Sequence, residues 1–238
     1  MRVAIAGCAG RMGRLLVAEI AASEHELAAA TVSAHSLQVG QDVGSIVGIE
    51  PLGVHASGEP AALFASDVVI DFTTPAATLR HAELAAIKKV PLIVGTTGMD
   101  AATEQALAKA AQVVPVLVAA NFSRGVALLL ELTQLAARAL PDADIGIYEM
   151  HHNKKKDAPS GTALALGAAC ERGVQYAALR GGTVTGDHTV TLALDGERIE
   201  LTHRGENRAI YAKGALAAAA WLIKQKPGRY TLSDLLKG

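Results

Sequence analysis

Two histidines, three lysines and a Ser-Gly-Thr sequence occur within one short segment of the chain, from His151 to Thr162. Histidine can give or take a proton near neutral pH, so His151 and His152 are candidates for acid–base chemistry. The run Lys154–Lys156 supplies positive charge, and Ser160-Gly161-Thr162 supplies hydroxyl and backbone hydrogen-bond donors. Together these residues predict a site that binds an anion and moves a proton.

The sequence on either side predicts the elements that position this segment. Residues Ile145–Glu149 alternate as in a strand, and Ala163–Ala169 is predicted to be helical, with Ser160 as a suitable N-cap. The free N–H groups and the positive dipole end of that helix would face whatever the loop holds. Neighbouring strand residues point to opposite faces, so His151 and His152 share one pocket only if the strand ends there.

A second motif lies near the N-terminus and predicts a dinucleotide site. An apolar strand, Arg2–Ala6, runs into Gly7-Cys8-Ala9-Gly10-Arg11-Met12-Gly13, and a helix follows. This is a G-x-x-G-x-x-G variant of the dinucleotide fingerprint. Gly7 permits the tight turn, Gly10 lets the backbone approach a pyrophosphate, and Gly13 lets helix and strand pack closely. The alternative is an ordinary strand–helix turn of an α/β protein; we favour the dinucleotide because the motif directly follows the first strand.

The residues after the second predicted strand leave the choice of dinucleotide open. Such sites usually place an acid there for the adenosine ribose of NAD, or an arginine for the 2′-phosphate of NADP. Here the strand Leu27–Val32 is followed by Ser33-Ala34-His35-Ser36, with neither. His35 or a serine hydroxyl can contact a 2′-phosphate, or the segment can be a plain loop. The expected cofactor is therefore NADH or NADPH.

Strands alternate with helices over the first half of the chain, which predicts an α/β fold with a doubly wound parallel sheet of Rossmann type. Ligands of such sheets lie at the carboxyl ends of the strands. Small or hydroxylated residues occupy these ends, as a cofactor lying across them requires, although such residues end many strands. The ends are the Gly7 turn, Phe72-Thr73-Thr74, Gly95-Thr96-Thr97 and Ala120-Asn121-Phe122. Residues 37–60 are expected to form a long surface connection that can include a short strand or two.

The pattern changes in the second half and predicts a sheet-rich domain from about residue 124 to 208. A long helix at Val126–Leu140 comes first, and Thr183–Thr185 and His188–Leu194 are predicted strands. Asp195-Gly196 is a strong hairpin signal, so Arg198–His203 is expected to return as the next strand.

Composition excludes several classes of function. The net charge is -1, so nothing indicates binding to nucleic acid or to an anionic membrane. No apolar run is long enough for a signal peptide or a membrane span. The two cysteines, Cys8 and Cys170, are far apart and have no metal-ligand spacing, which favours a reducing, cytoplasmic setting. Adjacent histidines without a spaced third ligand make a poor zinc site, so no metal is expected.

The chain closely resembles the 4-hydroxy-tetrahydrodipicolinate reductase (dihydrodipicolinate reductase) family of the diaminopimelate route to lysine, over essentially its whole length. The most specific part of the match is the signature Glu149-x-His151-His152-x-x-Lys155-x-Asp157-Ala158-Pro159-Ser160-Gly161-Thr162-Ala163-Leu164. Supporting matches are Gly7-x-x-Gly10-Arg11-Met12-Gly13, Asp71-Phe72-Thr73, Gly95-Thr96-Thr97-Gly98, Asn121-Phe122-Ser123, Gly186-Asp187-His188-Thr189, and His203-Arg204 with Arg208 and Gly214-Ala215.

The resemblance implies NAD(P)H-dependent reduction of a cyclic dicarboxylate and a role for each matching residue. His151 corresponds to the proton donor, Lys155 to the essential lysine that also binds substrate, and His152 to a substrate contact. The residues Ser160, Gly161 and Thr162 are expected to hold a substrate carboxylate. The expected cofactor contacts are Gly7, Cys8, Ala9, Gly10, Arg11, Met12, Gly95, Thr96, Thr97, Ala119, Ala120, Asn121 and Phe122.

The resemblance also implies the domain organisation. Residues 1–123 plus 209–238 are expected to form the dinucleotide-binding domain, because the last helices of the family return to it. Residues 124–208 are expected to form an α+β domain for substrate binding and oligomerisation, whose sheet builds a homotetramer. Two departures stand out: Ser33-Ala34 replaces an acidic–basic pair of some members, and the stretch Cys170–Arg180 is shorter than usual and is expected to be a surface loop.

Several alternatives stay open from the residues themselves. His152 can be structural, His188 and His203 are expected to line the sheet or a domain interface, and Arg208 can hold a carboxylate or pair with a glutamate. Another Rossmann dehydrogenase would use the same glycine turn without needing Lys155 together with Ser160–Thr162. A regulatory sensor would bind NAD(P) without turnover.

Overall fold

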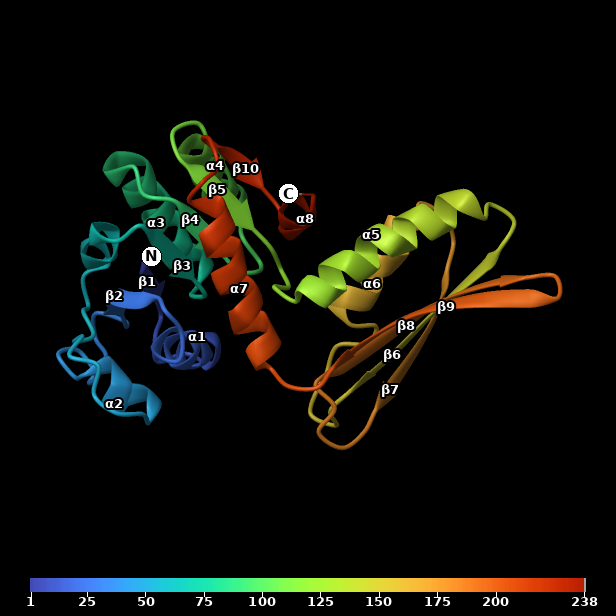
Figure 1. Cartoon of the computed structure of the whole chain (residues 1–238), viewed down its shortest axis with the longest axis horizontal. Coiled ribbons are helices and arrows are strands. Elements are labelled where there is room, and N and C mark those ends of the chain that lie inside the picture. Colours follow the sequence, from blue (N-terminus) through green and yellow to red (C-terminus); the bar gives the residue numbers. More distant parts are fainter. Residues whose placement is uncertain (238) are drawn as a thin grey trace. The chain divides into compact units, whose positions relative to one another are not determined.

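A computed structural model describes residues Met1–Lys237, which form two compact units (Figure 1). Unit 1 comprises Met1–Phe122 and the segment from Tyr211 onward, and unit 2 comprises Ser123–Ile210. The boundaries of these units lie next to those predicted from the sequence. No helix within residues 1–237 has the length and apolar character needed to cross a membrane.

Unit 1 is built on a six-stranded parallel sheet in the order β10-β5-β4-β3-β1-β2. The chain leaves β1 in one direction to β2 and then returns past β1 to β3, β4 and β5, so the predicted doubly wound sheet is confirmed. The strands are β1 (Arg2–Ala6), β2 (Glu26–Thr31), β3 (Val68–Asp71), β4 (Leu92–Val94), β5 (Pro115–Val118) and β10 (Gly228–Tyr230). The helices are α1 (Arg11–Ala21), α2 (Val43–Val47), the 3₁₀ helix η1 (Pro60–Ala65), α3 (Pro75–Lys88), α4 (Ala101–Ala111), α7 (Ala209–Leu222) and α8 (Leu232–Leu236).

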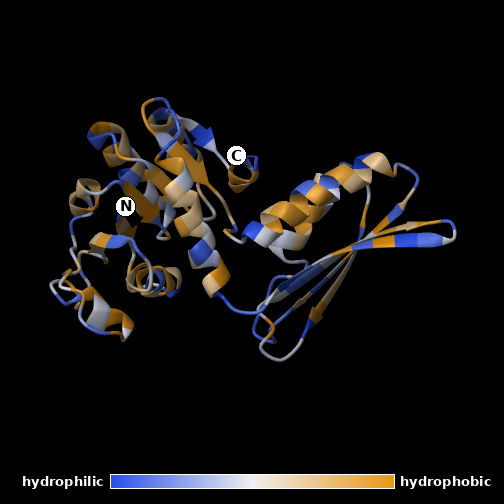
Figure 2. Ribbon diagram, viewed as in Figure 1, coloured by the Kyte–Doolittle hydropathy of each residue, from blue (hydrophilic) through white to orange (hydrophobic). Residues whose placement is uncertain are grey.

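The central strands of unit 1 are apolar on both faces because helices cover both sides of a parallel sheet. Ile5, Ile70 and Ile93 are fully buried, and Figure 2 shows the hydrophobic colour of this sheet. Side chains in the turns between strands and helices cap the first turn of the following helix. Thr74 caps α3 by accepting from Ala77 N–H, and Pro75 occupies the first turn, where its missing N–H has no cost.

Two parts of unit 1 differ from the prediction. The segment 37–60 was predicted to be a surface connection, but it contains the short helix α2, capped by Asp42, whose carboxylate also accepts from the amides of Leu52 and Gly53. The second difference is β10, which was not predicted and pairs with β5 at the edge of the sheet. Both elements are too short for hydrophobic periodicity to reveal them.

Unit 2 is a four-stranded mixed sheet in the order β7-β6-β8-β9, with two helices on one face (Figure 1). Strand β6 pairs in parallel with β7 and antiparallel with β8, and β8 and β9 form the predicted hairpin. The elements are α5 (Arg124–Ala139), β6 (Asp144–His151), α6 (Gly161–Ala169), β7 (Gln175–Arg180), β8 (Gly186–Leu194) and β9 (Glu197–Gly205). Alternate residues of β6 and β8 are buried under the helices, as period-2 patterning requires.

Two predictions for unit 2 are wrong. Residues Thr183–Thr185 are a turn and irregular backbone rather than a strand, and β8 starts only at Gly186. Residues Gln175–Arg180, predicted as part of a surface loop, form β7, so only Cys170–Val174 connect α6 to the sheet. Strand β7 lies at the sheet edge and is mostly exposed, so its sequence lacks the apolar alternation on which the prediction depended.

Candidate functional site

Strand β6 presents Glu149 and His151 on the face of the sheet that α5 and α6 cover, and both side chains are buried. The strand ends at His151, as two functional histidines in sequence would require. His152 has left the strand, is half-buried, and meets the guanidinium of Arg208 at 3.3 Å between Nε2 and Nη2. The two histidines therefore have different surroundings, and the structure pairs Arg208 with His152.

The Glu149 carboxylate is the centre of a buried polar network. One oxygen, Oε2, hydrogen-bonds His151 Nδ1, and Oε1 accepts from Arg180 Nη2 at 2.8 Å and from the Ser160 amide at 3.2 Å. Burial works to raise the pKa of Glu149, but the hydrogen bonds and charges of Arg180 and His151 outweigh it and hold this pKa below its usual range. Glu149 is therefore a buried anion that accepts hydrogen bonds from His151, Ser160 and Arg180.

His151 is balanced between opposing influences on its charge. Burial lowers its pKa, the carboxylate of Glu149 raises it, and the positive charges of Lys155 and Arg180 lower it, with a net result below the usual range. The neighbouring ring of His188 meets His151 edge-on, with centroids 5.1 Å apart. Burial lowers the pKa of His188 to about 4, so this second ring is neutral at physiological pH.

The loop after β6 distinguishes Lys155 from the two lysines beside it. Lys154 and Lys156 are exposed, whereas Lys155 is half-buried. Its Nζ contacts both oxygens of Asp157, at 2.9 and 2.8 Å. The hydrogen bond from Lys155 is the main reason why the pKa of Asp157 lies below its usual range. An anionic ligand of Lys155 would thus compete with Asp157.

The start of α6 completes the anion-binding side of the site. Ser160 is the N-cap as predicted: its Oγ accepts from Ala163 N–H at 3.2 Å, and the same Oγ is 3.2 Å from His188 Nε2. Gly161 is exposed and Thr162 is half-buried, so the first turn of the helix is open to a ligand. Helix-start amides, a lysine and a buried histidine can together bind a carboxylate and donate a proton nearby.

The donor atoms of Glu149, His151 and His188 also lie within 4.8 Å of one another, a spacing that could hold a metal ion. The hydrogen bonds and charges around Glu149, His151 and His188 do not suit a bound metal ion. Both Glu149 oxygens already accept hydrogen bonds, and His151 uses Nδ1 for that carboxylate. The cations Arg180 and Lys155 act on the same ring, so a further cation would meet repulsion.

The glycine turn of unit 1 has the geometry of a dinucleotide-binding turn. Gly7 has φ +77°, and a Cβ at Gly13 would lie 2.1 Å from the carbonyl oxygen of Gly7, so only glycine fits there. The amides of Gly7 and Cys8 donate to Thr31 O, at 3.0 and 2.9 Å, which joins the turn to the end of β2. The first amides of α1, which begins at Arg11, lack intrahelical acceptors and are the donors available to a phosphate.

Threonines and Asp71 connect the other strand ends of unit 1. Asp71 at the end of β3 accepts from Thr73 N–H and its hydroxyl, at 3.0 and 2.5 Å, and contacts His81 Nδ1 at 2.8 Å. The Thr96 hydroxyl lies 2.9 Å from that of Thr78 and 3.2 Å from the Thr73 amide. The side chain of the predicted cofactor residue Thr96 therefore serves the scaffold, as does Phe122, which is buried against Phe72.

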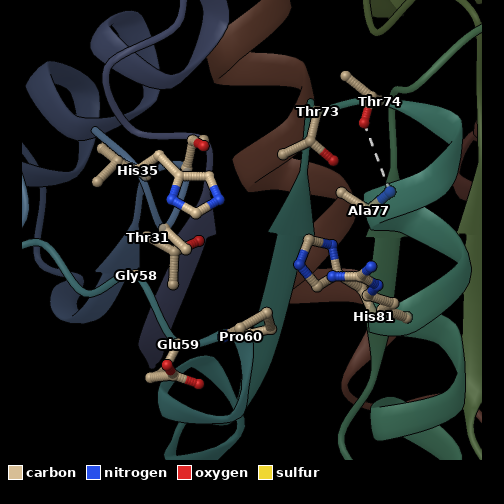
Figure 3. A pocket seen from close by; sticks show the side chains of 14 residues that line it. Thr31, His35, Gly58, Glu59, Pro60, Thr73, Thr74, Ala77 and His81 are labelled. Carbon is tan, nitrogen blue, oxygen red and sulfur yellow. Dashed lines mark hydrogen bonds between the residues drawn. The ribbon is translucent and has the colours of Figure 1, made fainter.

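A cavity of about 550 Å³ opens beside the glycine turn, between the end of β2, the start of η1 and α3 (Figure 3). Figure 3 shows His35 on one side of this cavity and His81 on the other. Arg80 and Glu59 also line it. The cavity, the free amides of α1 and the space secured by Gly13 fit the adenosine and pyrophosphate of a dinucleotide. Of the predicted cofactor residues, Gly7 lines the cavity, and the others follow β1, β4 and β5 at the same edge of the sheet.

Sequence reasoning missed the contribution of Glu149, Arg180 and His188 to the site. Glu149 precedes His151 by two residues, so the strand period alone places them on one face. His188 is paired with Glu149 in the β6–β8 register, which needed a correct strand alignment. Arg180 ends β7, the strand that was not predicted.

Comparisons with known proteins decide the family. Residues 1–122 match the family model described as dihydrodipicolinate reductase, N-terminus, and residues 125–236 match the one described as dihydrodipicolinate reductase, C-terminus. The chain belongs to the dihydrodipicolinate reductase family. The resemblance predicted from the signature at residues 149–164 is thereby confirmed, and the members of this family named below are reductases.

Relatives and solved structures agree over nearly the whole chain. The 4-hydroxy-tetrahydrodipicolinate reductases of Saccharophagus degradans and Rhodopseudomonas palustris are 40% and 43% identical, over 99% of this chain and 98% and 97% of theirs. Dipicolinate-bound dihydrodipicolinate reductase from Paenisporosarcina sp. TG-14 matches with a TM-score of 0.85 at 25% identity, covering 98% of both chains. An amine dehydrogenase from Mycobacterium smegmatis shares the fold alone, with a TM-score of 0.67 at 11% identity.

Proposed function

We propose that this protein reduces 4-hydroxy-tetrahydrodipicolinate to tetrahydrodipicolinate in the diaminopimelate pathway of lysine biosynthesis, with NADH or NADPH as reductant. The observation that carries the proposal is the buried pair of Glu149 and His151 beside Lys155 and the start of α6, in a chain of this family. A solved relative binds dipicolinate, a ring with two carboxylates, which is the kind of ligand this arrangement suits.

His151 is proposed as the proton donor. When bound, the reduced nicotinamide supplies a hydride to the substrate ring, and a proton must reach the atom where the negative charge accumulates. The pKa of His151 lies below its usual range, so the ring loses its proton readily. A bound dianion would raise that pKa again and would thus couple protonation of His151 to substrate binding.

Lys155 and the segment Ser160–Thr162 are proposed to bind the substrate carboxylates, with His152 as a further contact. Lys155 presents a half-buried ammonium group, and a substrate carboxylate would take over the place of Asp157. Gly161 and Thr162 begin α6, and the positive end of the helix dipole favours a carboxylate there. On this proposal unit 2 binds the substrate.

Unit 1 is proposed to bind the reduced dinucleotide at the carboxyl edge of its sheet. The pyrophosphate would accept from the first amides of α1, close to Gly10, Arg11 and Met12. The cavity beside β2 would take the adenosine end. Arg80 and His35 suit a 2′-phosphate there, and Glu59 suits a free ribose hydroxyl, so rates with NADPH and NADH report which group dominates.

A homotetramer built through the sheet of unit 2 is part of the proposal. Helices α5 and α6 cover one face of that sheet, and the opposite face carries Tyr148 and Leu179, which are 38% and 51% exposed. Apolar side chains gathered on an uncovered sheet face favour burial against another copy. Sedimentation measurements test this assembly. A cytoplasmic location is proposed because both cysteines are free and buried.

A coupled assay tests the proposed function. The preceding synthase would generate the substrate from pyruvate and aspartate semialdehyde, and nicotinamide absorbance would be followed with NADH and NADPH in parallel. Consumption of reduced cofactor that depends on the synthase supports the reductase. Binding of a dinucleotide without consumption would instead indicate a regulatory sensor, and turnover only with other small acids would indicate a different dehydrogenase.

A further inference from the structure

The side chain of Glu149 has an environment that packing alone does not explain. It is a carboxylate with 1% of its side chain exposed, on a strand whose other covered positions include Ile145 and Ile147. Transfer of a carboxylate out of water is expensive, and apolar residues of similar volume often stabilise a core as well or better. A charge kept in such a place therefore indicates a role beyond stability.

The partners of Glu149 come from three elements and converge on one oxygen pair. Arg180 from β7 and the Ser160 amide at the start of α6 hydrogen-bond Oε1, and His151 from β6 itself hydrogen-bonds Oε2. Arg180 Nη2 also donates to the carbonyl oxygen of Asp157 at 2.6 Å, which fixes the loop that carries Lys155. One carboxylate thus connects the histidine, the lysine loop and the helix start.

We propose that Glu149 is a positioning residue, which holds Nδ1 of His151 and thereby makes Nε2 the atom that delivers the proton. This inference rests on the proposed function. With Nδ1–H donated to Glu149, the tautomer and the ring orientation are both fixed, and only Nε2 can exchange a proton with a ligand. The ring keeps this orientation whether His151 is charged or neutral, because Glu149 accepts the same hydrogen bond in both states.

Space at Nε2 agrees with this assignment. A Cβ at Gly186, the first residue of β8, would lie only 2.9 Å from His151 Nε2. Glycine at this position therefore leaves room beside Nε2 that a larger residue would fill.

The ionisable groups around His151 come from four parts of unit 2. Glu149 lies on the same strand, Arg180 on β7, Lys155 on the following loop and His188 on β8, where its pKa of about 4 keeps it neutral. Glu149 is the one group among these whose charge raises the pKa of His151. Removal of the Glu149 charge should therefore lower the pKa of His151, because the remaining charged groups, Lys155 and Arg180, both lower it.

The test compares Glu149→Gln with Glu149→Asp in the full-length protein. The Gln variant keeps the volume and removes the charge, so we expect the pKa of His151, followed by NMR of its ring protons, to fall. The alkaline limb of kcat/KM should move to lower pH with it, and turnover at pH 7 should drop about tenfold for each unit of that movement. The Asp variant keeps the charge, so its alkaline limb should stay near that of the wild type.

Controls separate this role from a purely structural one. Glu171→Gln makes the same chemical change at a surface ion pair of unit 2 and should leave both profiles unchanged. Gly186→Ala keeps Glu149 and should lower kcat by crowding Nε2, with binding of the dinucleotide intact. This variant also serves if Glu149→Gln does not fold. Wild-type turnover by Gly186→Ala would show that Nε2 is not the delivering atom and would overturn the proposal.

The titration of His151 by NMR can be read whether or not the proposed reaction is correct. An unchanged His151 titration in folded Glu149→Gln would overturn the positioning role even if the wild type reduces its substrate. A lowered His151 pKa in Glu149→Gln, together with a wild type that has no reductase activity, would support the contact between Glu149 and His151 and would overturn only the proposed reaction.

Discussion

Each unit of this protein contains a buried carboxylate paired with a histidine. In unit 1, Asp71 at the end of β3 contacts His81 Nδ1 at 2.8 Å, and both side chains are almost fully buried. In unit 2, Glu149 near the end of β6 contacts His151 Nδ1, and the histidine is 11% exposed. Taken alone, the two contacts are the same motif.

Their surroundings differ, and the difference separates scaffold from chemistry. The second oxygen of Asp71 is held by the amide and hydroxyl of Thr73, which are neutral donors within unit 1. The second oxygen of Glu149 is held by Arg180, and Lys155 adds a second positive charge that acts on His151. A carboxylate–histidine contact therefore indicates acid–base function only where fixed charges and an open helix start surround it.

His151→Ala should have the largest effect on turnover. Loss of a general acid is expected to lower kcat by about 10²–10⁴-fold, whereas binding of the reduced dinucleotide in unit 1 should hardly change. Steady-state rates from the coupled assay and dinucleotide titration measure the two quantities. Full turnover by His151→Ala would mean that the pair of Glu149 and His151 has no more of a catalytic role than the pair of Asp71 and His81.

Asp71→Ala should have its main effect on folding. The substitution leaves His81 and the hydroxyl of Thr73 without their buried acceptor, so we expect the free energy of unfolding to fall by about 3–5 kcal/mol. Chemical denaturation measures this loss, with turnover per folded molecule as the comparison. An Asp71→Ala variant that is as stable as the wild type but inactive would mean that the pair of Asp71 and His81, rather than that of Glu149 and His151, has the catalytic role.

Protonation of His188 should make unit 2 sensitive to acid. Its pKa is near 6.5 in the unfolded chain and about 4 in the folded protein, so its contribution to stability is present above pH 6.5 and is lost as the pH falls toward 4. The loss should reach about 3 kcal/mol, since each pKa unit corresponds to about 1.4 kcal/mol. Denaturation at pH 7 and pH 4 tests this, and His188→Asn should flatten the difference.

Lys155→Met should weaken substrate binding more than cofactor binding. A hydrogen bond to a charged group contributes about 1.5–3 kcal/mol, which corresponds to a rise in KM of about 10–100-fold. Lys156→Met, one position along and exposed, is the matched control and should change KM little. Equal effects of the two substitutions would mean that the loop acts as a diffuse positive surface rather than through Lys155.

Local patterns in the sequence predicted the parts of the fold that depend on local chemistry. The cap at Ser160, the close packing at Gly13 and the doubly wound sheet all follow from residue type and spacing. Strand β7 was missed because an exposed edge strand has little apolar alternation, and Arg180 was lost with it. Spacing alone also could not distinguish Lys155 from its neighbours, since their difference in burial arises from the fold of the loop.

Strand β7 also bears on how this protein tolerates insertions and deletions. Its residue-by-residue pairing with β6 places Arg180 opposite His151 in the register. A slip of one residue would turn Arg180 to the other face of the sheet and leave Glu149 without its guanidinium. The connection Cys170–Val174 only has to reach the start of the strand. We therefore expect an insertion or deletion between Cys170 and Val174 to be tolerated, whereas one within β7 would shift its register with β6.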